Sequence, residues 1–174
     1  MVAASHSTLV SAGGKVVIQR PKGVSYGIGY TNGTDILPGY LVTGDGMTSP
    51  DLNLVDAAGE EIAGVAVRMV GTAAATAPDT AFSDNEPFEY APRGSGMVCY
   101  VKFTSNNGWQ PGEWLVGAGD GTGEGSWDDA VADNLSTCMD AFRDLIGTAV
   151  EFVGDTSDGS SSNTYSYELV RLSL

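Results

Sequence analysis

The sequence predicts a mainly β protein: two related β-hairpin or small-barrel units that form a compact β-barrel or sandwich, with one amphipathic helix. The first observation is a repeat, in which a Pro-Gly turn, a short apolar run and a Gly-Asp-Gly turn occur at residues 38–46 and again at 111–121. Each copy is followed by an apolar segment containing Gly-x-Ala-Val, at 62–67 and 145–150. The offset grows from about 73 to about 83 residues, which indicates one structural unit used twice, with an insertion in the second copy.

The second observation is composition, because 24 of the 174 residues are glycine while 42% are hydrophobic. Many turns between short apolar runs favour strands over helices. The third observation is that a helical spacing of apolar residues continues over one region only, residues 126–146. These features bound the fold to one β core, or to two small β lobes that share a core.

The first half of the chain reads as a series of short strands. Residues 15–20 are rich in β-branched side chains and are closed by Pro21, and residues 26–30 alternate glycine with larger side chains. Asn32-Gly33 follows, a strong hairpin signal. The first copy of the repeat comes next, then a strand at 52–55 and the apolar segment 62–70.

An Ala/Thr-rich stretch, residues 72–79, suggests the division between the halves. We therefore expect a flexible N-terminal arm at 1–14 and a single β domain at 15–174. The domain would consist of two pseudo-repeats, at about 15–71 and 79–174.

In the second half, residues 97–103 form the strongest strand pattern, and residues 164–174 give a terminal strand. Between them, apolar residues from Trp127 to Ile146 recur on one helical face. Ser126 is a natural N-cap and Gly147 a natural stop, so the helix is expected at about 126–146.

The chain is strongly acidic, with 22 Asp and Glu against 8 Lys and Arg and a net charge of −14. Nucleic acid and anionic membranes would repel such a surface, so neither is expected as a partner. At molar salt the Debye length falls to ~3 Å and the self-repulsion largely disappears. The composition therefore suits a halophilic protein, and the alternative is an ordinary acidic surface that maintains solubility.

The sequence offers little catalytic or metal chemistry. Its only histidine, His6, lies in the arm, so no nucleophile–histidine arrangement on a rigid scaffold is available. Cys99 and Cys138 lie in apolar surroundings and are expected to be buried free thiols, with no zinc-ligand spacing around them. Asp155-Thr156-Ser157 resembles an aspartic protease motif but has Ser in place of Gly, and a turn after a strand explains it better.

Residues 120–131 resemble a calcium-binding loop in the spacing of Asp120, Thr122 and Glu124. The twelfth position is Val131, where such a loop needs a bidentate Glu, so an EF-hand is not expected. A weak cation site at Asp120–Glu124 is left open. We expect no enzyme activity, and no catalytic, cofactor-binding or metal site.

The order of these turns and strands resembles the head-decoration (capsid cement) proteins of tailed viruses with HK97-type capsids. In that family a Pro-Gly strand, a Gly-x-Ala-Val strand, a Val-rich strand, a second strand ending in Gly-Asp-Gly-Thr, another Gly-x-Ala strand and a terminal strand follow one another. The matching segments here are residues 38–42, 62–67, 93–103, 111–122, 146–152 and 154–174. The helix expected at 126–146 departs from the pattern, since a shorter connection would be usual there.

The resemblance implies a structural virion protein, located on the outer capsid surface, that stabilises contacts between capsomers. The partners it implies are the major capsid protein and further copies of the chain, as a homotrimer. With the acidic composition, it suggests a virus of a haloarchaeal host.

Candidate contact residues for the capsid or for neighbouring subunits are in the arm and among turn aromatics, which anchor many interfaces. They are His6, Leu9, Val10, Tyr40 and Trp109. The alternative is that the aromatics belong to the core, and for Trp114 we expect the core. An alternative function is another virion or cell-surface β module, such as a spike, tail or carbohydrate-binding domain, with Trp109 or Tyr165 and Tyr167 as a glycan platform.

Overall fold

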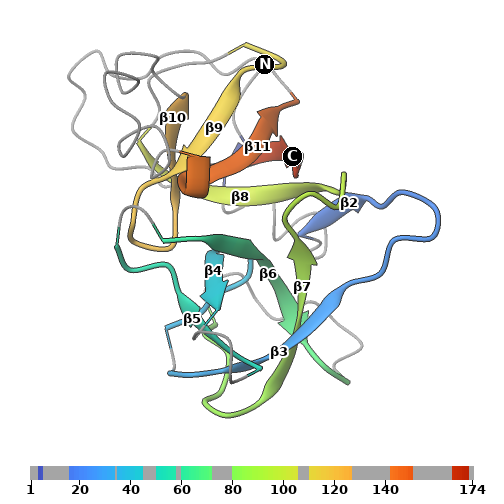
Figure 1. Cartoon of the computed structure of the whole chain (residues 1–174), viewed down its shortest axis with the longest axis vertical. Helices are drawn as coiled ribbons and strands as arrows, with labels where there is room; N and C mark the ends of the chain where they lie inside the picture. The colour runs from blue at the N-terminus through green and yellow to red at the C-terminus, as the bar shows by residue number, and fades with distance from the viewer. Residues whose placement is uncertain are drawn as a thin grey trace.

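The protein consists of two five-stranded β-barrels that follow each other along the longest axis of the molecule (Figure 1). The computed structural model describes residues 4–5, 16–33, 35–44, 50–57, 60–71, 80–105, 110–126, 142–150 and 166–172. The mainly β fold that the sequence predicts is confirmed.

The first barrel is closed by five strands in the order β3-β5-β4-β6-β7. Only β3 and β5 are parallel; the other neighbours are antiparallel. Its interior is filled by a cluster of buried apolar side chains: Ile36, Val42, Leu52, Ala66, Phe82 and Phe88. The strands are β3 (Gly27–Thr31), β4 (Leu41–Gly44), β5 (Asp51–Leu54), β6 (Ile62–Met69) and β7 (Pro87–Pro92).

The second barrel belongs to a seven-stranded sheet in which an additional pairing of β12 with β8 closes five strands into a ring. The ring order is β8-β10-β9-β11-β12, and again only its first and second members, β8 and β10, are parallel. Its strands are β8 (Val98–Ser105), β9 (Trp114–Gly117), β10 (Gly123–Ser126), β11 (Leu145–Ala149) and β12 (Ser166–Arg171).

Two strands from the N-terminal part of the chain extend this sheet. β1 (Ala4–Ser5) pairs with β12, and β2 (Val17–Gln19) pairs with the beginning of β8. Ala4 and Ser5 lie in the segment where we expected a flexible arm, and the structure pairs them with a strand. The first barrel thus has its own closed set of strands, while the second is extended at two edges.

The two barrels share their strand register as well as their topology. Val42 lies opposite Gly64 in the first barrel, and Leu115 lies opposite Gly147 in the second. In both pairs of strands one residue beside the glycine is bulged, Ala63 in β6 and Ile146 in β11. The β4–β6 pair is therefore equivalent, residue by residue, to the β9–β11 pair.

The Pro-Gly turns that precede these strands are also equivalent. Both glycines adopt positive φ, 85° at Gly39 and 92° at Gly112, a conformation that favours glycine. Each glycine N–H donates to the carbonyl of the equivalent alanine, over 2.8 Å to Ala66 and over 2.8 Å to Ala149. Each alanine N–H returns a bond of 2.8 Å to the residue after the glycine. The repeated sequence thus forms the same hydrogen-bonded turn twice.

One apolar core joins the barrels. Leu41 and Val65 are fully buried, and they belong to the same cluster as Val101, Leu115 and Leu172 of the second barrel. Their neighbours in sequence, Val42 and Ala66, face the interior of the first barrel, so Leu41 and Val65 point outward from it. The contact between the barrels is therefore made of the outer face of β4 and β6.

Several details differ from the sequence-based expectations. The hairpins at the two copies of the repeat are confirmed, as β4–β5 and β9–β10. The hairpin expected at Asn32-Gly33 is wrong, because β3 pairs with β5 and β7 and not with the next strand. The Asn32-Gly33 turn is held instead to the turn that precedes β7, where the Gly33 N–H donates to Asp84 Oδ1 over 2.8 Å.

The predicted bounds of the helix also differ. Ser126 ends strand β10, while Leu145 and Ile146 begin strand β11, so only residues 142–144 are helical in the described part of this segment. Gly147 does not stop a helix, because it lies within β11 against the backbone of Arg171. Residues 127–141 lie outside the described residues. We expected the division between the pseudo-repeats at residues 72–79. Strand β7 lies beyond that stretch and closes the first barrel, so the barrels meet at residues 93–97.

Candidate interaction surfaces

Of the predicted contact residues, only Tyr40 lies in the described part of the chain. His6, Leu9, Val10 and Trp109 lie outside the described residues, and their roles stay predictions. The same holds for the glycan platform proposed for Trp109, Tyr165 and Tyr167, since no side chain of these is described.

Tyr40 lies at the junction of the two barrels. Lys102 Nζ lies 2.6 Å from the Tyr40 hydroxyl oxygen, to which it donates, and 4.7 Å from the centre of the ring. The backbone joins the barrels at the same place, where the Lys102 N–H donates to the Gly39 carbonyl over 3.0 Å and the Leu41 N–H donates to the Gly121 carbonyl over 2.7 Å. Tyr40 thus contributes first to an internal contact, and a further contact with a capsid stays a prediction.

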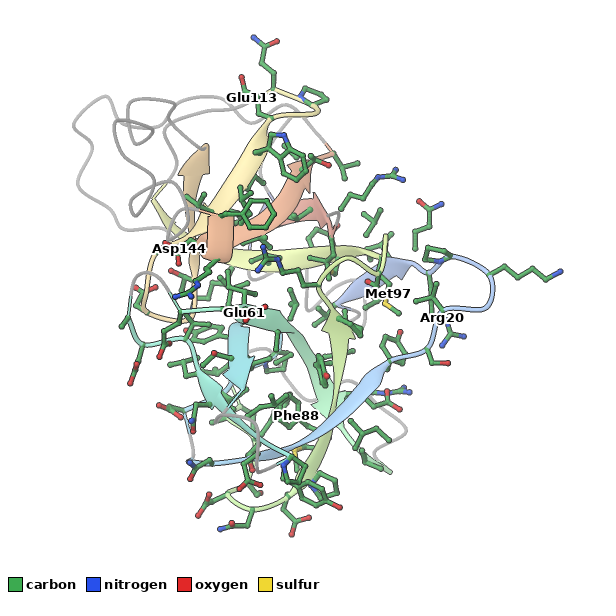
Figure 2. All side chains as sticks on the ribbon, in the orientation of Figure 1. Arg20, Glu61, Phe88, Met97, Glu113 and Asp144 are labelled. Atoms are coloured by element: carbon green, nitrogen blue, oxygen red, sulfur yellow. The ribbon has the colours of Figure 1, made fainter. Side chains whose placement is uncertain are left out.

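Arg93 forms a second link between the barrels. It follows β7, and its two terminal nitrogens donate to the carbonyls of Phe142 over 2.6 Å and Arg143 over 3.0 Å. Figure 2 shows Glu61 of the first barrel and Asp144 of the second on either side of this junction. Burial lowers the pKa of Arg93, while the charges of Glu61 and Asp144 oppose that shift.

A shallow, open groove lies beside this link. It has a volume of about 530 Å³ and is lined mainly by Glu61, Ala63, Arg93, Gly94 and Phe142. The Arg93 guanidinium lies 5.7 Å from the centre of the Phe142 ring, which covers one side of the groove. The polar groups that line the groove face one another across the junction, so the groove belongs to a structural link between the barrels.

The loop considered for a cation forms a local turn. Asp120 Oδ1 accepts hydrogen bonds from the Thr122 N–H, over 3.0 Å, and from the Thr122 hydroxyl. The carboxylate therefore replaces a backbone acceptor in the turn between β9 and β10. Within the described ranges, no group of three His, Cys, Asp or Glu side chains could hold a metal ion.

Cys99 is a free thiol in the shared core, which confirms the expectation for this residue. It is fully buried, and burial raises its pKa well above the ordinary value for a thiol. A thiolate is the reactive form of cysteine, so Cys99 is inert in the folded protein. Cys138 lies outside the described residues.

The exposed apolar side chains define two surfaces that sequence reasoning missed. Trp114 was expected in the core, and this expectation is wrong: the side chain is 36% exposed on the outside of the second barrel. Ile28 and Tyr30 are 62% and 42% exposed on neighbouring outward positions of β3. The outward register of Trp114 could have been found by aligning Pro38 with Pro111, which makes Trp114 equivalent to Leu41 rather than to Tyr40.

No family model matches the chain, and no curated protein matches its sequence. None of the helical residues in the described ranges belongs to a helix that could cross a membrane.

Proposed function

We propose that this chain is a structural virion protein that binds the outer surface of an assembled capsid and stabilises contacts between capsomers. Its partners are the major capsid protein and other copies of the chain, as a homotrimer, and it acts on the outside of the virion. The observation that carries the proposal is the order of turns and strands in the sequence, which resembles that of capsid decoration proteins. The matching segments overlap strands β4, β6, β8, β9, β11 and β12, which belong to the two barrels.

The arrangement of the N-terminal segment supports this function. β1 adds to the edge of β12 through antiparallel pairing at Ala4–Ser5, so residues from the segment expected as an arm form part of a sheet. Strand addition is a common way for an extended segment to bind a neighbouring sheet edge. An arm that pairs in this way could equally bind the edge of a shell protein.

The test is binding to the capsid itself. Particles of the virus that encodes this chain would be stripped of loosely bound proteins, purified, and mixed with the recombinant chain before sedimentation through a cushion. We expect the chain to pellet with the particles, to saturate at a fixed ratio to the major capsid protein, and to raise the temperature at which the shells open. A chain that stays in the supernatant at every salt concentration would rule the proposal out.

A further inference from the structure

Asn32 and Gly33 follow strand β3, and they do not form the hairpin turn that their sequence suggests. Asn32 is exposed, and Gly33 is half-buried with a φ of 115°. An Asn-Gly sequence is also chemically labile, because glycine has no side chain to shield its backbone nitrogen from the asparagine before it. In the part of the chain that the structure describes, this is the only Asn-Gly sequence. It is therefore the place to look for deamidation.

Deamidation converts asparagine into aspartate or isoaspartate without an enzyme. The backbone nitrogen of the next residue loses its proton to a base in solution and attacks the asparagine Cγ. A new carbon–nitrogen bond forms, the side-chain nitrogen takes up a proton and leaves as ammonia, and a cyclic succinimide remains. Water then opens the ring at either carbonyl. The reaction at Asn32 thus requires a deprotonated Gly33 nitrogen that can reach Asn32 Cγ.

The Gly33 nitrogen is not free in the folded protein. Its N–H donates to Asp84 Oδ1 over 2.8 Å, and the other oxygen of that carboxylate accepts from Asn85 Nδ2 over 2.8 Å. The carboxylate is thus held in place, with one oxygen on the proton that the reaction must remove. Its negative charge disfavours the amide anion that would attack, because like charges repel. Asp84 does not take the proton itself, since a carboxylate is a much weaker base than an amide anion.

The peptide groups on both sides of Asn32 are also held in orientation. The group before it is fixed at both ends: the Asn85 N–H donates to the Thr31 carbonyl over 3.0 Å, and the Asn32 N–H donates to the Leu52 carbonyl over 3.2 Å. The group after it is fixed by the N–H that the carboxylate holds. Any backbone rotation that would bring the next nitrogen toward the Asn32 side chain turns one group against the other. Such a rotation must break hydrogen bonds at the end of β3.

We propose that Asn32 is a deamidation site and that Asp84 protects it, by keeping the proton on the Gly33 nitrogen and by fixing the turn. The bond joins residues that are 51 positions apart in the sequence, so the protection exists only in the folded protein. This inference does not depend on the proposed function.

The products of the reaction would disturb the same turn. Asp35 Oδ1 lies 3.1 Å from the position that a Cβ on Gly33 would occupy, and Asp84 lies on its N–H. Aspartate at position 32 would add a third carboxylate there, in a chain whose net charge is already −14. Isoaspartate would lengthen the backbone by one carbon atom, so the neighbouring groups could not all keep their hydrogen bonds. Either product would loosen the end of β3, a strand that closes the first barrel.

The experiment follows the loss of ammonia from Asn32 with time. The unmodified chain and Asp84→Ala are kept folded in mildly alkaline buffer, sampled, digested and analysed by peptide mass spectrometry. Isoaspartyl methyltransferase quantifies the isoaspartate product. We expect Asn32 to react about three- to tenfold faster in Asp84→Ala, the effect of losing one exposed hydrogen bond to a charged group. In guanidinium chloride the two proteins should react at the same rate, because the bond no longer exists.

The matched control is Asp35→Ala, which removes a carboxylate from the same turn and leaves the bond from Gly33 in place. It should change the rate at Asn32 by less than about twofold. Asp84→Asn retains an acceptor oxygen without the charge, so its rate should lie between those of the unmodified chain and Asp84→Ala. Near-UV circular dichroism verifies that each variant is folded. The second Asn-Gly sequence, residues 107–108, is an internal reference for the conditions of incubation.

Three results would overturn the inference. The first is an equal rate at Asn32 in the folded unmodified chain and in folded Asp84→Ala. The second is a slower reaction in Asp84→Ala, because the carboxylate would then act as a base that promotes the attack. The third is an unmodified chain that reacts as fast when folded as it does in guanidinium chloride.

Discussion

At the scale of single residues, Gly64 and Gly147 show why each copy of the repeat contains Gly-x-Ala-Val. A Cβ on Gly64 would collide with the carbonyl oxygen of Ala91, and a Cβ on Gly147 would collide with that of Arg171. Both obstacles are backbone atoms of a neighbouring strand, so they cannot rotate away as a side chain could. We expect Gly64→Ala and Gly147→Ala each to lower the free energy of unfolding by about 1–3 kcal/mol, measured by urea denaturation of the dilute monomer.

The control for both is Gly44→Ala. Gly44 also lies in a strand, at ordinary φ, with no atom within 4 Å of the added Cβ. Its substitution should change the stability by less than about 0.5 kcal/mol. If Gly64→Ala proved as stable as Gly44→Ala, the close approach of β6 and β7 would not be what requires this glycine.

Cys99 gives a prediction about reactivity. With Cys138→Ser as background, Cys99 is the only thiol, and its reaction with a disulfide reagent at pH 8 should require unfolding. We expect the reaction of the folded protein to be at least about a thousandfold slower than the reaction in guanidinium chloride. The reason is that about one molecule in a thousand, or fewer, is unfolded at any moment in a protein of ordinary stability. Fast labelling of the folded protein would contradict the burial of this thiol.

The raised pKa of Cys99 also sets a direction for the pH dependence. Above the ordinary value of 9.0, the unfolded chain gains a thiolate that the folded protein cannot accommodate. The contribution of this thiol to stability is therefore complete below pH 9 and is lost as the pH rises further. Cys99→Ala should remove that part of the alkaline destabilisation.

At the scale of elements, Arg93 fastens the end of β7 to the turn that precedes β11. Its substitution by methionine keeps the apolar stem but removes both bonds to the carbonyls of Phe142 and Arg143. Hydrogen bonds from a charged donor contribute about 1.5–3 kcal/mol, so Arg93→Met should destabilise the protein by an amount of that order. Arg93→Lys should restore only part of the loss, since one ammonium cannot reproduce the planar fork.

Arg20→Met is the comparison for this link. Arg20 is exposed and lies over the Tyr26 ring at 5.3 Å, a contact with a ring face rather than a pair of hydrogen bonds to backbone carbonyls. It should cost no more than about 1 kcal/mol in chemical denaturation. Equal effects of Arg20→Met and Arg93→Met would show that the bonds across the junction have no special weight.

The elements also show which parts of the fold a sequence can reveal. The hairpins at the repeat were predictable because Pro-Gly and Gly-Asp-Gly turns are local signals. The Asn32-Gly33 hairpin failed because β3 finds its partners at β5 and β7, beyond the reach of a turn signal. The apolar spacing at Leu145–Ile146 fitted a helix, yet the bulged pairing of β11 with β9 uses both residues in a strand.

At the scale of the whole molecule, the duplication was visible in sequence but its limits were not. Each barrel is completed by two strands, β3 and β7 in the first and β8 and β12 in the second. These pairs have no repeated sequence motif in common and are equivalent only in register. The exposed position of Trp114 follows from aligning the two copies of the repeat and not from its local sequence, which suggested a core residue. Tertiary pairing, rather than local propensity, decides both.

The net charge is also a property of the whole molecule, and it predicts how the stability depends on salt. A net charge of −14 on 174 residues repels itself at low salt and so destabilises the compact state. Raising KCl from about 0.05 M to 2 M shortens the Debye length from more than 10 Å to less than ~3 Å. We expect the melting temperature to rise by about 5 °C or more, which for a chain of this size corresponds to roughly 1–3 kcal/mol.

Sucrose separates charge screening from a general effect of cosolvents. An excluded cosolvent stabilises folded proteins without screening charge. Sucrose at equal osmolality should therefore reproduce only that part of the rise in melting temperature which continues to increase at high KCl concentration. Screening should act mainly below about 0.5 M KCl, where the Debye length changes most. A melting temperature that is the same at low and molar salt would show that the acidic surface serves ordinary solubility, and a gain that sucrose matches throughout would exclude self-repulsion as its cause.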